Sequence, residues 1–126
     1  MDSPSHSVLI VDDDPSIRLL CRVNLELDGW HVVEAGTVEQ ARSVLTENEV
    51  SVMLLDVHVG TADGLQFLAE IRHDRPGLRV ALLTGSAGPT SADQARADDV
   101  LTKPFTLEKL NETVSRLALT TVEKAG

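Results

Sequence analysis

The sequence predicts an α/β protein with one parallel sheet and helices packed on both of its faces. Short apolar runs, the first at 7–11, alternate five times with amphipathic stretches. Alternation of this kind is typical of strand–helix–strand units, whose parallel strands are buried on both faces and read as continuous apolar runs. A chain of 126 residues predicts a single domain, 1–126, with a core at about 7–119 and flexible ends at 1–6 and 120–126.

Local signals place the elements that follow the first strand. Asp14 and Pro15 suit the cap and the first turn of a helix that ends at Gly29. Thr37 and Gln40 form a capping box for the second helix. The apolar stripe of the first helix is expected to comprise Ile17, Leu20, Cys21 and Leu25. Further strands are expected at 31–35, 51–56, 78–84 and 100–101, and further helices at 38–45, 64–73 and 107–117.

A fourth helix, between the last two strands, is expected to be short. The stretch 85–97 contains alanine but no Leu, Ile or Val that would anchor a helix to the sheet. Ser91 and Gln94 suit a capping box. We therefore predict at most two helical turns here, weakly held and mobile.

Composition excludes several classes of protein. The net charge is −9 and there is no run of basic residues, so direct nucleic-acid binding is not expected. The longest apolar runs have four or five residues, too short for insertion into a membrane. The single cysteine, Cys21, cannot form an internal disulfide, which favours a cytoplasmic protein.

Acidic residues cluster where two of the predicted strands end. Asp12 and Asp13 follow the first strand and Asp56 ends the third, and ligands of such sheets bind at the carboxyl ends of the strands. Two carboxylates about 5 Å apart repel by roughly 3 kcal/mol at an effective dielectric of about 20. A bound Mg²⁺ or Mn²⁺ would offset that repulsion, since both take oxygen ligands. The alternative is that these aspartates only cap helices and end strands.

Two further residues at the same edge favour a site that handles an anion. Lys103, which precedes Pro104, follows the fifth strand and can reach the acidic cluster or hold a phosphoryl oxygen. Thr84 closes the fourth strand and adds a hydroxyl donor. Either residue alone would be an ordinary surface lysine or strand-end threonine, so the prediction depends on their sharing one edge.

These residues lie in motifs that resemble the receiver domain of bacterial two-component response regulators, in the chemotaxis-regulator-like superfamily. The motifs are VLIVDD at 8–13, LLD at 54–56, DG at 63–64, TG at 84–85 and LTKPF at 101–105. They occur in order at the expected strand ends, and the resemblance covers about 7–119. It implies a five-stranded, doubly wound, flavodoxin-like (βα)5 fold.

The resemblance also implies a function and a role for each site residue. Asp56 would be the phosphoacceptor for a sensor histidine kinase or a histidine phosphotransfer protein. Lys103 would pair with the phosphoryl group, and Thr84 would hydrogen-bond it. The chain would be a switch with changing affinity for an unknown downstream protein, not an enzyme with an external substrate. Mg²⁺, or alternatively Mn²⁺, would be held by Asp12, Asp13, Asp56 and the backbone carbonyl of His58.

The sequence departs from the receiver pattern at one position that leaves alternatives open. Receivers often carry Tyr or Phe three residues before the lysine, where this chain has Val100, a residue stiff at χ1. Val100 and the short fourth helix favour a second hypothesis, a receiver-like adaptor that works without phosphorylation. A third is a small Mg²⁺-dependent phosphohydrolase, although the chain leaves little room for a substrate pocket. The intact set of acidic, lysine and threonine residues favours the receiver.

Other residues have narrower interpretations. The side chain of His58 is expected at the rim of the site, where it would tune access of water. By analogy with the family, kinase specificity is expected on exposed positions of the first helix such as Arg18, Leu19 and Arg22. Cys21 is interpreted as a core residue of that helix.

Overall fold

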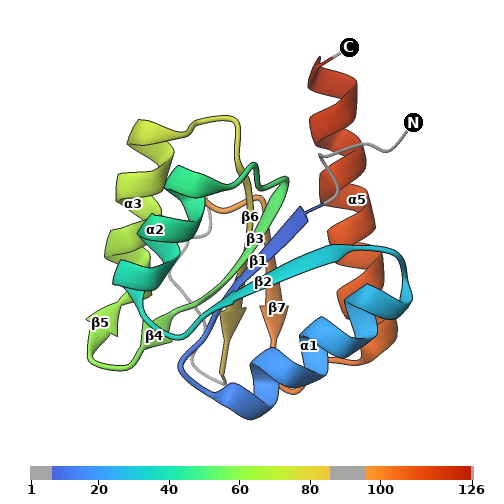
Figure 1. Ribbon diagram of the computed structural model, residues 1–126, viewed down its shortest axis with the longest axis horizontal. Coiled ribbons are helices and arrows are strands. Elements are labelled where there is room, and N and C mark those ends of the chain that lie inside the picture. The colour runs from blue at the N-terminus through green and yellow to red at the C-terminus, as the bar shows by residue number, and fades with distance from the viewer. Residues whose placement is uncertain (1–6, 86–95, 126) are drawn as a thin grey trace.

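A computed structural model describes residues 7–85 and 96–125, with side chains as far as Leu119. Five parallel strands form one sheet in the order β2-β1-β3-β6-β7 (Figure 1). The chain places β2 on one side of β1 and β3 on the other, so the strand order reverses between β1 and β3. In doubly wound sheets a ligand binds outside the carboxyl ends of the strands at this reversal. The strands are β1 (Ser7–Val11), β2 (His31–Ala35), β3 (Val52–Asp56), β6 (Arg79–Thr84) and β7 (Asp99–Thr102).

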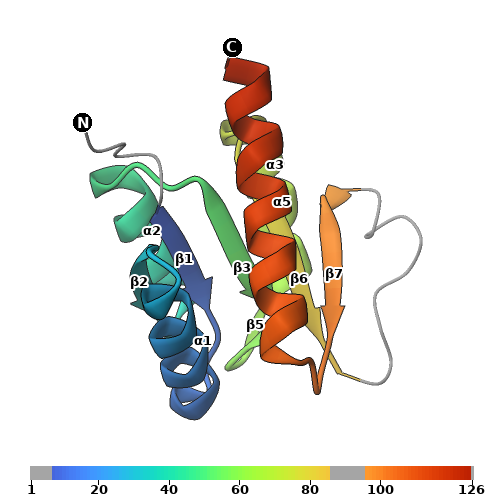
Figure 2. The same cartoon turned by 90° about the vertical axis from the view of Figure 1, so that its right-hand side faces the viewer.

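Helices cover both faces of the sheet. Helices α1 (Pro15–Leu27) and α5 (Leu107–Ala125) lie on one face, and α2 (Val38–Glu47) and α3 (Gly64–Asp74) lie on the other (Figures 1 and 2). The doubly wound fold predicted from the alternating pattern is thereby confirmed. The fourth helix expected near Ser91 lies outside the described residues.

Alternate side chains of each strand supply two separate apolar cores. Leu9 and Met53 pack with α2 and α3, whereas Ile10 and Leu54 pack with α1 and α5. All four are fully buried, which explains why the strands read as continuous apolar runs. Cys21 lies in the core beneath α1, as interpreted from the sequence. Burial, and to a lesser degree the negative charge of Asp12, raises the pKa of its thiol to about 11, so the thiol stays protonated at neutral pH.

The helix starts follow the local signals in the sequence. Asp14 caps α1 by accepting a hydrogen bond from the Ser16 N–H, with Pro15 in the first turn. Thr37 caps α2 in the same way, through the Gln40 N–H. The stripe expected on α1 is wrong at one position, because Leu20 is 47% exposed and does not join the core.

Several element boundaries differ from the prediction. A short antiparallel hairpin of β4 (His58–Val59) and β5 (Ala62–Asp63) follows β3 and was not predicted. Gly60 has a φ of 64° at its turn, a value that favours glycine. Strand β7 is longer than the two residues expected, and α5 remains helical through Ala125, beyond the end expected for the core. Among the helices of the described residues, none has the length and apolarity needed to cross a membrane.

Candidate functional site

Extensions of the sheet ladder position the backbone of the site. The Asp12 N–H donates to the Ala35 carbonyl, which carries the β1–β2 pairing one residue past β1. The Lys103 N–H likewise donates to the Thr84 carbonyl at 2.7 Å. Because the strands are parallel, these extensions place Asp12, Thr84 and Lys103 at the same edge of the sheet as Asp56, the last residue of β3. The predicted convergence is therefore observed.

The acidic cluster is compact. Asp12, Asp13 and Asp56 each offer a carboxylate oxygen, and these atoms lie within 4.8 Å of one another. Asp12 is fully buried, the Asp56 side chain is 13% exposed, and Asp13 faces solvent. One open side and several oxygen donors fit a hard divalent cation that keeps some of its water ligands. The donor set thus fits Mg²⁺, the metal implied by the motifs.

Lys103 supplies the positive charge of the site. Its Nζ lies 2.9 Å from Asp12 Oδ2 and 3.4 Å from Asp56 Oδ2, so one ammonium group bridges two carboxylates. Burial lowers the pKa of Lys103, but the hydrogen bond to Asp12 and the charges of both aspartates outweigh it and leave the pKa raised. The ammonium therefore stays charged at neutral pH, where it can offset part of the negative charge. The peptide bond between Lys103 and Pro104 is cis.

The electrostatics of Asp56 differ from those of an ordinary surface aspartate. Burial raises the pKa of its carboxyl, and the Asp12 charge raises it further. Lys103 and the His58 N–H lower this pKa, without reversing the net shift. Asp56 is thus a partly buried carboxylate whose charge is only partly compensated by the protein. Such a group gains from a further cation at the same place.

Thr84, His58 and Val100 are the remaining residues that the sequence singled out. Thr84 is buried, and its hydroxyl donates weakly to the Gly85 carbonyl at 3.5 Å. The His58 N–H lies 3.4 Å from Asp56 Oδ1, and the His58 side chain is exposed at the start of the hairpin. The expected ligand role of the His58 carbonyl stays a prediction. Val100 lies half-buried on β7 against the core beneath α2 and α3.

Gly64 is a positioning residue that sequence reasoning did not assign a role. A Cβ at this position would lie 2.1 Å from the Asp56 carbonyl oxygen and 2.7 Å from that of Val57. The Gly64 N–H also donates to the Val57 carbonyl at 2.7 Å. The start of α3 therefore packs directly on the backbone that carries Asp56. The signal in the sequence was the DG pair at 63–64, where Asp63 caps α3.

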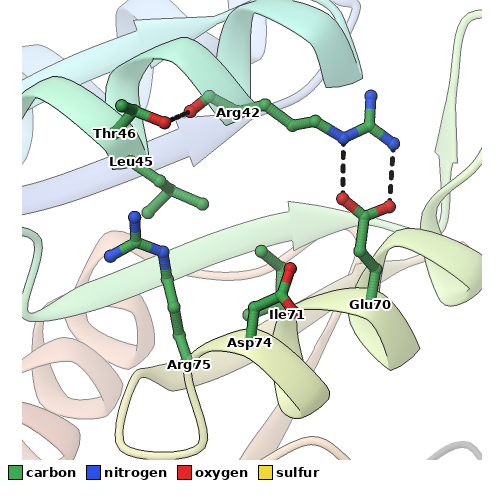
Figure 3. Close-up of a pocket in the computed structure, with 7 residues that line it drawn as sticks. All are labelled: Arg42, Leu45, Thr46, Glu70, Ile71, Asp74 and Arg75. Carbon is green, nitrogen blue, oxygen red and sulfur yellow. Dashed lines mark hydrogen bonds and ion pairs between the residues drawn. The ribbon is translucent and has the colours of Figure 1, made fainter.

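A separate pocket of about 430 Å³ lies between α2 and α3 (Figure 3). Its main feature is an ion pair between Arg42 and Glu70 that contains two hydrogen bonds. The Arg42 guanidinium also lies 5.4 Å from the centre of the Phe67 ring. The lining residues come from the C-terminal parts of both helices, or directly follow α3. This is the end of the molecule opposite to the acidic cluster, and the pocket takes no part in the site.

Fold and site together define a receiver-type α/β domain, in which an acidic cluster, a lysine and a threonine meet at the carboxyl edge of a doubly wound sheet. The chain belongs to the response regulator receiver domain family, whose model matches residues 8–115. It is therefore a receiver domain of the two-component response regulators, as its motifs implied.

Similar proteins support this assignment. The probable transcriptional regulatory protein TcrX of Mycobacterium tuberculosis is 33% identical over 99% of this chain and 56% of its own length. GlrR, a transcriptional regulatory protein of Escherichia coli, is 32% identical over 88% of this chain and 26% of its own length. The chain thus spans about half of one curated relative and a quarter of the other.

Solved structures of receiver domains show the same fold. The receiver domain of NtrX from Brucella abortus superposes with a TM-score of 0.85 at 27% identity, over 90% of this chain and 98% of that one. A CheY-like receiver domain protein from Methanospirillum hungatei gives a TM-score of 0.83 at 26% identity, with coverages of 93% and 97%. The five-stranded, flavodoxin-like fold implied by the motifs is confirmed.

Proposed function

We propose that Asp56 accepts a phosphoryl group from a histidine of a sensor kinase or phosphotransfer protein. The phosphorus–nitrogen bond of the phosphohistidine breaks as a phosphorus–oxygen bond to the Asp56 carboxylate forms, and the electron pair leaves with the imidazole. The observation that carries this proposal is the single Lys103 ammonium within 3.4 Å of both the Asp56 and the Asp12 carboxylates. Phosphoryl transfer asks a protein mainly for positioning and charge compensation, and this cluster provides both.

The chain's own residues divide the remaining tasks. Asp12, Asp13, Asp56 and the His58 carbonyl would hold Mg²⁺, which when bound offsets negative charge on the phosphoryl oxygens. Lys103 would hold a phosphoryl oxygen from the β7 side. The Thr84 hydroxyl would exchange its weak bond to Gly85 for one to the phosphoryl group. The chain then acts as a phosphoacceptor and switch, not as an enzyme with an external substrate.

The exposed face of α1 suits the phosphodonor. Leu19, Leu20, Val23 and Leu27 are exposed apolar residues on this helix, and α1 begins three residues after Asp12. A patch of this kind beside a reactive site is typical of a docking surface. Arg18 does not belong to it, contrary to the expectation from the sequence, because its side chain is only 20% exposed and pairs with Glu34. A cytoplasmic location is part of the proposal, in keeping with a single unpaired cysteine.

Intact mass after incubation with acetyl phosphate tests the proposal. We expect one added phosphoryl group in the wild type with Mg²⁺, and none without Mg²⁺ or in Asp56→Asn. If no adduct forms although Mg²⁺ binds, beryllofluoride binding distinguishes rapid hydrolysis from a site that cannot accept the group. Absence of adduct, beryllofluoride binding and metal binding would refute the proposal. That result would favour the phosphorylation-independent adaptor, which Val100 in place of an aromatic residue also favours.

A further inference from the structure

Arg18 connects helix α1 to the end of strand β1. Its Nη1 donates to the Asp12 backbone carbonyl at 2.6 Å, and its Nε donates to Glu34 Oε1 on β2 at 3.0 Å. The guanidinium is planar and presents its donors in a fixed fork, so two partners, one directly after β1 and one on β2, define its position. Arg18 therefore ties the backbone of a proposed metal ligand to a second strand of the sheet.

The surroundings of Arg18 keep it in this place. Glu34 also accepts a hydrogen bond from Arg22 Nη1 at 2.8 Å, so its carboxylate is held from two sides. Gly36 leaves the space for the guanidinium, since a Cβ there would lie 3.0 Å from Arg18 Nη1. The side chain of Arg18 is 20% exposed. A long cationic side chain so placed exchanges water for defined partners, which indicates a structural task and not a solvated surface charge.

Asp13 is the member of the acidic cluster that depends on this arrangement. In the described part of the chain, no hydrogen bond or ion pair holds its carboxylate, which faces solvent. Its position therefore follows from the peptide that joins it to Asp12. Asp12 itself is fixed by burial, by the Lys103 ammonium and by its N–H bond to Ala35. The carbonyl held by Arg18 belongs to the same peptide that leads into Asp13.

We propose that Arg18 is a positioning residue for divalent-cation binding: by holding the Asp12 carbonyl, it orients the Asp12–Asp13 peptide so that the exposed Asp13 carboxylate meets the cation. This inference rests on the proposed function, because it assumes a cation at the acidic cluster. Glu34 positions the guanidinium, and Gly36 gives it room. Groups that orient metal ligands from outside the coordination sphere change metal affinity by about 10- to 100-fold when removed.

The direction of the change in Mg²⁺ affinity distinguishes a positioning role of Arg18 from an effect of its charge. Arg18 is a cation near a cation site, so loss of its charge alone would strengthen Mg²⁺ binding. Weaker binding in Arg18→Gln therefore reports lost orientation of Asp13. Arg22→Gln is the matched control, because it also removes one positive charge and one hydrogen bond to Glu34 but touches no backbone at Asp12.

The experiment is an amide NMR titration of each variant with Mg²⁺, which gives the affinity and shows that the chain is folded. We expect Arg18→Gln to bind Mg²⁺ about 10- to 100-fold more weakly, and Arg22→Gln to bind as tightly as wild type or more tightly. Gly36→Ala keeps Arg18 but crowds its guanidinium, and should weaken binding by less. If Arg18→Gln does not fold, the Mg²⁺ affinity of Gly36→Ala tests the inference in its place.

Three results would overturn the inference. Equal Mg²⁺ affinities of wild type and Arg18→Gln would show that the Asp13 carboxylate is oriented without Arg18. Equal weakening in Arg22→Gln would show that the effect arises from the Glu34 ion pairs in general. A wild-type chain that binds no Mg²⁺ would overturn the proposed function and this inference together, whereas the first two results leave the proposed function standing.

Discussion

The stability of the fold should increase when Asp56 is replaced by Asn, in the absence of a divalent cation and at neutral pH. The folded-state pKa of Asp56 is raised above its ordinary value of 3.8, chiefly by burial and then by the Asp12 charge. The folded protein therefore binds this proton more tightly than the unfolded chain does. Any stability from Asp56 is present below the unfolded pKa and is lost as the pH rises through the folded pKa. At pH 7 the carboxylate opposes folding.

The size of the effect follows from the distances around Asp56. Asp12 and Asp13 each lie within 4.8 Å, so the repulsion is at least about 3.5 kcal/mol per pair at an effective dielectric of about 20. Lys103 at 3.4 Å returns about 5 kcal/mol of attraction on the same scale. Because Asp13 is exposed, solvent screens its share, and the Coulomb terms nearly cancel. Burial of the charge then determines the sign, and we expect Asp56→Asn to stabilise the fold by about 1 kcal/mol.

Thermal unfolding in a chelating buffer measures this difference. A gain of about 1 kcal/mol corresponds to a rise of about 4 °C in Tm for a domain of this size. The gain should shrink as the pH falls through the raised folded-state pKa of Asp56, where the wild type takes up its proton. Mg²⁺ should stabilise the wild type more than the variant, since it has one carboxylate more to bind. An Asp56→Asn variant that is no more stable than wild type at pH 7 without metal would refute the reasoning.

Three further predictions concern the neighbours of this carboxylate. Lys103→Met should lower Tm without metal and tighten Mg²⁺ binding, because two aspartates lose their shared counter-charge; an unchanged Tm in chelating buffer would contradict this. Gly64→Ala should lower the free energy of unfolding in urea by about 1–3 kcal/mol, because its Cβ would overlap the Asp56 carbonyl. Gly77→Ala, where a Cβ meets nothing within 4 Å, is its control and should be nearly neutral. His58→Ala should keep the fold and change the lifetime of the phosphorylated form, measured as phosphate release, because its backbone N–H contacts Asp56 Oδ1 and its side chain is exposed; an unchanged rate would remove that role.

The sequence was most informative where backbone topology alone brings residues together. Asp12, Asp56, Thr84 and Lys103 lie up to 91 residues apart along the chain, yet each follows or ends a strand of a parallel sheet. Parallel strands place their carboxyl ends at one edge, so the cluster could be predicted without any knowledge of side-chain contacts. The buried strands were equally predictable, because burial on both faces leaves an uninterrupted apolar run.

What the sequence could not provide are contacts set by tertiary packing. Arg18 reads as one more charge on an amphipathic helix, and only the fold brings Glu34 and the Asp12 carbonyl within its reach. Leu20 has the spacing of a core residue but lies beyond the edge of the buried stripe. The hairpin after β3 has two residues in each strand, too few for a period-2 pattern to be recognised.

The design of the site explains why its charges are tolerated. Asp12 is fully buried beside Asp56, and a pair of close carboxylates costs stability unless cations compensate it. Among the described residues, Lys103 is the cation that pairs with these carboxylates, one charge against three, so compensation by the protein is incomplete. Complete compensation by the protein would stabilise the fold but would weaken the attraction for the divalent cation and the phosphoryl group that we propose for this site. Strands β1 and β6, which flank β3, are fully buried and stabilise the rest of the sheet. The cost of the close carboxylates is therefore confined to one edge of the sheet.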